Sequence, residues 1–61
     1  MDKYERILEN VYLKDESLEE MCEMYDVEES EIVDIIFYEE WDGFSDELKR
    51  VLRIRKNEMI G

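Results

Sequence analysis

Histidine and proline are absent from this 61-residue chain, and cysteine occurs once. Without histidine, the chain lacks the side chain that most often transfers protons near neutral pH. It also lacks a glycine-rich phosphate loop and a cysteine–histidine pair. One cysteine cannot form an intrachain disulfide, a zinc site needs more cysteine or histidine, and the segment DGFSDE lacks the alternating oxygen ligands of a calcium loop. We therefore expect no enzymatic activity, no cofactor and no metal site.

Long hydrophobic runs are also missing. No apolar stretch approaches the roughly 18 residues needed to span a membrane. The first ten residues, MDKYERILEN, lack the basic region and the apolar stretch of a signal peptide. The expected location is the cytoplasm of a bacterium or of a phage-infected host cell, with no membrane partner.

Basic residues are few, because eight lysines and arginines stand against 19 acids, for a net charge of -11. Residues 1–47 hold 18 of the acids and three bases, for -15, whereas residues 48–61 hold five bases and Glu58, for +4. Such charge is compatible with disorder, but 44% hydrophobic residues and seven aromatics favour a folded domain. A chain of this length makes one domain with a small core, so a homodimer or a partner protein would add stability.

The apolar residues that are present recur at the three- and four-residue spacing of helices. Ser17 followed by Glu20 forms a capping-box pattern, and Ser45 followed by two acids is a favourable helix start. Breaks fall at the segment KDES and at Asp42-Gly43. We predict an all-α fold with helices over about residues 2–13, 18–25, 29–40 and 46–58.

Residues 17–36, SLEEMCEMYDVEESEIVDII, resemble the helix-turn-helix superfamily, with bacterial sigma-factor region 4 and resolvase-like domains as the nearest comparisons. Cys22 takes the place of the small residue in the first helix, and Val27 that of the buried turn residue. Asp26 falls where glycine is usual, and Glu28 replaces the usual serine or threonine cap. Apolar residues fill the remaining core positions: Leu18, Met21, Tyr25, Ile32, Ile35 and Ile36.

The resemblance implies a small bundle of about four helices around a helix-turn-helix core. It also requires a left-handed backbone at Asp26, which aspartate tolerates better than most residues. An ordinary pair of short helices in an acidic bundle is the alternative interpretation.

The second helix of that superfamily contacts bases, and neighbouring basic or small polar groups hold phosphates. The corresponding helix here has no lysine or arginine. A carboxylate about 4 Å from a DNA phosphate costs around 1 kcal/mol even at the dielectric constant of water. The second and third helices instead carry a repeated array of acids: Glu19, Glu20, Glu23, Glu28, Glu29, Glu31 and Asp34. One interpretation is a nucleic-acid mimic that binds the basic surface of a partner protein. The other is a solvated face that keeps the domain soluble.

A second apolar stripe is predicted on the third helix, where Val33, Phe37 and Trp41 follow one another at four-residue spacing. The last helix could fold back over this stripe and bury it under Leu48, Val51, Leu52 and Met59. Otherwise the stripe is an interface for a partner, in which aromatic side chains commonly act as anchors.

The last predicted helix is basic, with five cationic side chains: Lys49, Arg50, Arg53, Arg55 and Lys56. They could contact DNA phosphates if a dimer grips DNA with its terminal helices. Alternatively they neutralise the acidic body, and the spacing of Asp46 and Arg50 suits an ion pair within the helix.

The sequence thus predicts a small acidic regulatory protein that binds a protein of the transcription or nucleic-acid machinery. Its size and charge are reminiscent of small phage proteins that act on host machinery. The alternatives are a DNA-binding helix-turn-helix transcriptional regulator, acting as a dimer through the basic last helix, and a structural subunit of a larger assembly.

Overall fold

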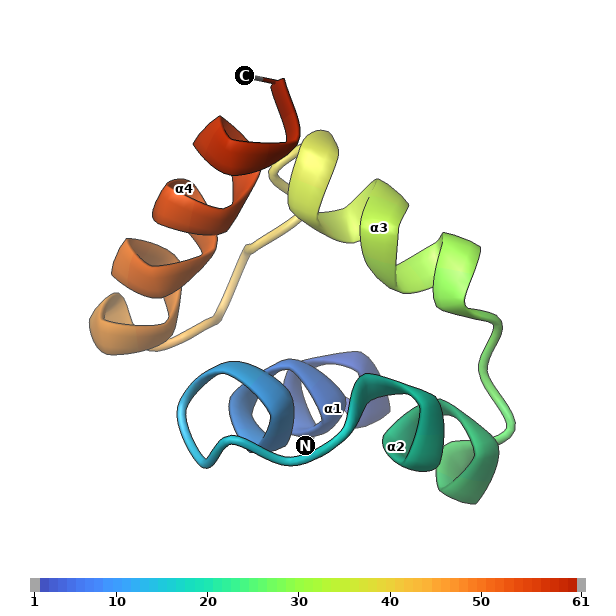
Figure 1. The fold of residues 1–61 in the computed structure, drawn as a ribbon. Coiled ribbons are helices and arrows are strands. Elements are labelled where there is room, and N and C mark those ends of the chain that lie inside the picture. The colour runs from blue at the N-terminus through green and yellow to red at the C-terminus, as the bar shows by residue number, and fades with distance from the viewer. Residues whose placement is uncertain (1, 61) are drawn as a thin grey trace.

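The computed structural model describes residues 2–60, and this part of the chain contains four helices (Figure 1). They are α1 (Lys3–Tyr12), α2 (Leu18–Tyr25), α3 (Glu29–Phe37) and α4 (Asp46–Ile60). The predicted all-α bundle of about four helices is confirmed. No strand occurs within the described residues, and none of their helices is long and apolar enough to cross a membrane.

The helices begin at polar caps. The Ser17 hydroxyl accepts a hydrogen bond from the amide of Glu20 at 3.3 Å, and the Ser45 hydroxyl accepts one from Leu48 N–H at 3.2 Å. Both caps were expected from the sequence, because a serine oxygen satisfies one of the free amides in the first turn. The Asp2 carboxylate caps α1 in the same way.

The end of α2 depends on a left-handed residue. Asp26 has φ 56° and ψ 52°, as the helix-turn-helix resemblance requires. This conformation lets the amide of Val27 reach the carbonyl of Cys22 at 2.9 Å, while the amide of Asp26 reaches that of Glu23 at 3.3 Å. The pair of bonds is the Schellman pattern, which satisfies carbonyls left free at a helix end.

The end of α3 differs from the prediction. This helix ends at Phe37 rather than near residue 40, because Glu39 also adopts a left-handed conformation, with φ 53°. The amide of Glu40 then donates to the carbonyl of Ile35 at 3.0 Å, which completes a second Schellman pattern. Trp41 consequently lies in the loop after α3, and its placement on a helical stripe was wrong.

The core lies where the four helices meet. Figure 1 places α1 and α2 below α3 and α4, and α1 contacts α4 while α2 contacts α3. Six side chains are completely shielded from solvent: Ile7, Leu8, Ile32, Ile36, Leu48 and Leu52. Burying each one contributes about 1.5–3 kcal/mol relative to an exposed position. Met21, Cys22, Val27 and Ile35 are also buried, as the helix-turn-helix pattern predicts, whereas Leu18 and Tyr25 are half-buried.

Candidate protein-binding surfaces

The acidic face consists of the seven carboxylates predicted on the second and third helices: Glu19, Glu20, Glu23, Glu28, Glu29, Glu31 and Asp34. All seven side chains are exposed. The ion pairs among the described residues use Glu39 and Glu58 as their acids, so none of the seven carboxylates is paired with a described base. The acidic face therefore presents its charge to solvent without internal neutralisation.

The structure divides this face into two parts. On α2, Glu20 and Glu23 border a shallow hollow beside the exposed Met24. At the N-terminus of α3, Glu28, Glu29 and Glu31 gather where the positive end of the helix favours them, whereas Asp34 lies farther along the helix. There the pKa of the Cys22 thiol is raised, mainly by its burial and further by the nearby carboxylates of Glu28, Glu29 and Glu31.

Glu31 differs from the other members of the acidic face because both of its carboxylate oxygens accept bonds within the chain. The Tyr4 hydroxyl donates to Oε1 at 3.1 Å, and the amide of Glu28 donates to Oε2 at 2.9 Å. The hydrogen bond to Glu31 is also the main reason why the pKa of Tyr4 is raised above its ordinary value. The sequence interpretation missed this role, although Glu31 stands three residues after the helix cap, as the glutamate of a capping box does.

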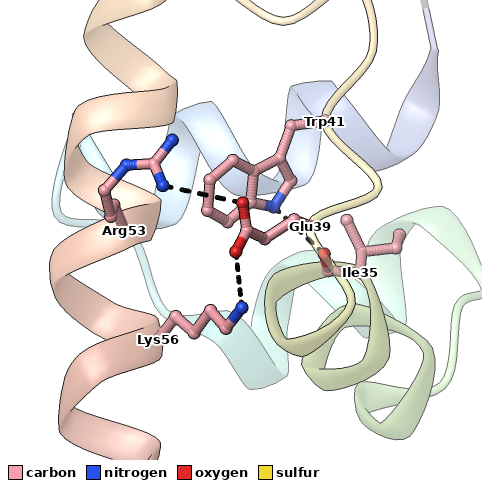
Figure 2. Close-up of polar contacts among 5 residues, drawn as sticks. All are labelled: Ile35, Glu39, Trp41, Arg53 and Lys56. Atoms are coloured by element: carbon pink, nitrogen blue, oxygen red, sulfur yellow. Dashed lines mark hydrogen bonds and ion pairs between the residues drawn. The ribbon is translucent and has the colours of Figure 1, made fainter.

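The predicted apolar stripe does not exist as one surface. Val33 and Phe37 are each 41% exposed on α3, whereas Trp41 is only 4% exposed. The indole N–H of Trp41 donates to the carbonyl of Ile35 at 3.0 Å, which ties the ring to α3 (Figure 2). Phe37 instead packs edge-on against Tyr38, with ring centres 5.1 Å apart, and both remain accessible.

The last helix was predicted to fold back over the apolar stripe, and it does so only in part. Leu48 and Leu52 are completely buried in the core, and Val51 is half-buried, but Met59 remains exposed near the end of α4. The end of α4 approaches Phe37 through Lys56, whose Nζ lies 6.0 Å from the centre of the ring.

The basic side of α4 is engaged with the turn after α3. Figure 2 shows Glu39 between Arg53 and Lys56: the guanidinium of Arg53 lies 3.6 Å from one carboxylate oxygen, and the Lys56 ammonium donates to the other. The hydrogen bond from Lys56 is the main cause of the lowered pKa of Glu39, and the charges of Lys56 and Arg53 add to it. Arg53 also covers the ring of Trp41, with its guanidinium carbon 5.3 Å from the ring centre.

The other three bases of α4 fall into two groups. Arg55 pairs with Glu58 at 3.0 Å and lies over the ring of Tyr12, 5.5 Å from its centre. Lys49 and Arg50 border a hollow on the outer side of the helix, and neither forms an ion pair with another described residue. The expected pair between Asp46 and Arg50 is therefore not formed. Internal contacts thus engage three of the five predicted phosphate-binding side chains.

Within residues 2–60, no group of three or more His, Cys, Asp or Glu side chains is placed to hold a metal ion. No protein-family model, curated protein or solved structure matches the chain significantly, so the proposals below are based on its own residues.

Proposed function

We propose that this protein is a small acidic regulator that binds another protein of the transcription or nucleic-acid machinery, through a surface that normally contacts nucleic acid. The observation behind this proposal is the unpaired charge of the acidic face. Its carboxylates lie on α2, on α3 and at the cap that precedes α3, and all of them are exposed. On the cationic helix α4, Arg53, Arg55 and Lys56 make contacts of their own.

Complementary charge would both accelerate and orient such binding. A cluster of like charges steers an oppositely charged partner and can raise the association rate constant from about 10⁵–10⁶ to as much as 10⁸–10⁹ M⁻¹s⁻¹ at low salt. The acids also carry the charge that a phosphate chain would present, so a partner that binds through them should release nucleic acid.

The first experiment captures partners from a bacterial lysate with the tagged protein, with and without nuclease treatment, and identifies them by mass spectrometry. A captured nucleic-acid-binding protein is then tested for displacement of its DNA or RNA by this protein. The proposal would be supported by partners whose capture persists after nuclease treatment and which release their nucleic acid when they bind this protein. A partner that holds its nucleic acid equally well in the presence of this protein would refute mimicry.

A matched pair of charge reversals locates the surface. The Glu23→Lys, Asp34→Lys double variant changes two exposed carboxylates that lie beyond the first turns of α2 and α3. Glu31 is left intact, because its substitution would also remove internal hydrogen bonds. We expect the double variant to bind the partner at least about tenfold more weakly, or about 1.4 kcal/mol. The control, Glu16→Lys with Asp42→Lys, makes the same charge change in loops and should bind nearly as tightly as the unchanged protein.

A DNA-binding regulator that acts as a dimer through α4 is the second candidate. It is favoured by Lys49, which is half-buried, and Arg50, which is exposed, because neither forms an ion pair with another described residue. In that case capture from the lysate would disappear after nuclease treatment. DNA affinity would fall steeply with salt, and Lys49→Glu with Arg50→Glu would abolish it.

A further inference from the structure

A groove lies between the start of α1, one side of α3 and the loop that precedes α4. It is open to solvent along one side and has a volume of about 340 Å³. Three mainly apolar side chains form its floor: Tyr4, Ile35 and Phe44. Four carboxylates border it: Asp2, Glu31, Asp34 and Glu40. No lysine or arginine lines it.

The groove combines fixed and free negative charges. Glu31 is held in place through both of its oxygens, by the Tyr4 hydroxyl and by the backbone. Asp34 and Glu40 are exposed and form no hydrogen bond or ion pair with another described side chain. A positively charged guest would therefore meet one carboxylate already oriented and two that can adjust to it.

The floor suits the apolar part of such a guest. Ile35 and Phe44 are only 9% and 8% exposed, whereas Tyr4 is half-buried, so an aliphatic stem lying across the three would shield mainly the Tyr4 ring from water. The ammonium of Lys3 already lies over the Tyr4 ring, with Nζ 5.6 Å from the ring centre, so this ring takes part in a cation–π interaction.

We infer that the groove receives an arginine side chain from the partner protein. A guanidinium is planar, carries five N–H donors and stacks on aromatic rings, so it can bridge separated carboxylates while its stem covers the floor. This inference rests on the proposed function and narrows it, because it names one recognition position within a larger acidic surface. The groove is the place where a buried anchor residue of the partner would be inserted.

The test uses the peptide acetyl-Arg-Gly-Arg-amide as the probe, titrated into the isotope-labelled full chain while amide signals are followed by NMR. The same peptide with citrulline in place of arginine keeps the shape and removes the charge. We expect the arginine peptide to give saturable shifts at Tyr4, Ile35 and Phe44, and the citrulline peptide to give none.

Two variants of equal charge complete the test. Asp34→Asn with Glu40→Gln changes the border of the groove, whereas Glu20→Gln with Glu23→Gln changes the hollow on α2. The first should weaken binding of the arginine peptide at least about tenfold, and the second by less than about twofold. Both pairs are exposed, so their amide spectra should retain the dispersion of the unchanged fold.

Equal weakening by both variants, or shifts spread over all acidic segments, would overturn the groove as a specific position and leave the proposed function standing. Absence of saturable binding by the arginine peptide would likewise refute the inference. Failure of the proposed function has a separate signature, which is a partner that keeps its nucleic acid in the displacement experiment above.

Discussion

Replacing Asp26, the left-handed residue that ends α2, with asparagine or glycine should stabilise the domain. Two effects at this position lower the stability of the fold. A non-glycine residue with φ 56° crowds its Cβ against the backbone. In addition, the carboxylate of Asp26 lies at the negative end of α2, two residues before Glu28 and three before Glu29, the acids at the start of α3.

Three substitutions separate these effects. Asp26→Asn retains a side chain that tolerates the left-handed region and removes the charge, so we expect a gain of about 0.3–1 kcal/mol. Asp26→Gly also relieves the strain of the left-handed backbone, which should add roughly another 0.5–1 kcal/mol of stability. Asp26→Ala removes the charge but tolerates this conformation poorly, so it should be about 1 kcal/mol less stable than the asparagine variant.

Thermal unfolding followed by circular dichroism measures the series. In a domain of this size, 1 kcal/mol shifts the melting temperature by roughly 4–8 °C, so the expected differences can be resolved. The order should be glycine above asparagine above aspartate, and the gain of the asparagine variant should shrink in high salt. A glycine variant that melts at or below the unchanged protein would refute the reasoning.

Three further predictions concern the turn after α3 and the core. Trp41→Phe should lose about 0.5–1.5 kcal/mol in urea denaturation, because it removes the indole hydrogen bond to the carbonyl of Ile35, which still accepts from the amide of Glu40; an unchanged midpoint would contradict this. The lowered pKa of Glu39 means that its contacts stabilise the fold above the ordinary pKa of the group and are lost as pH falls through the folded value. Glu39→Gln should therefore destabilise at pH 7 but not at strongly acidic pH, unlike the control Glu23→Gln, which removes an exposed carboxylate late in α2 that has no ion pair with a described residue. A pH-independent effect would oppose the assignment. Because burial raises the pKa of Cys22, its thiol should react with a disulfide reagent far more slowly in the native protein than in urea, and equal rates would argue against the burial.

The parts of the fold that were predictable depend on local chemistry. Ser17 and Ser45 cap helices because a hydroxyl oxygen can reach an amide three residues ahead, and this requires no knowledge of the rest of the chain. The core positions of α2 and α3 followed from apolar spacing, and the left-handed Asp26 followed from the helix-turn-helix pattern.

The end of α3 was not predictable in this way. Glu39 and Glu40 are good helix formers, and neither glycine nor proline marks a stop there. The helix ends because burial of Trp41, its bond to Ile35 and the cations of α4 together favour a turn at Glu39. These are contacts between distant residues, which periodicity cannot reveal.

The same limit applies to the candidate surfaces. Exposure of the acidic face could be inferred from its polar spacing. The division of the apolar stripe at Trp41 could not, and neither could the groove, because Tyr4 and Phe44 come from opposite halves of the chain. The bond between Tyr4 and Glu31 spans 27 positions in the sequence and has no local pattern.

The packing of Trp41 also has a spectroscopic consequence. It is the only tryptophan in the chain, it is almost fully shielded from water, and Arg53 of α4 lies over its ring. Its fluorescence therefore provides a label-free optical reporter of whether α4 is docked against the turn. Because Trp41 follows Glu40 directly, the same emission can be monitored while a ligand enters the neighbouring groove, without attaching a dye to so small a protein.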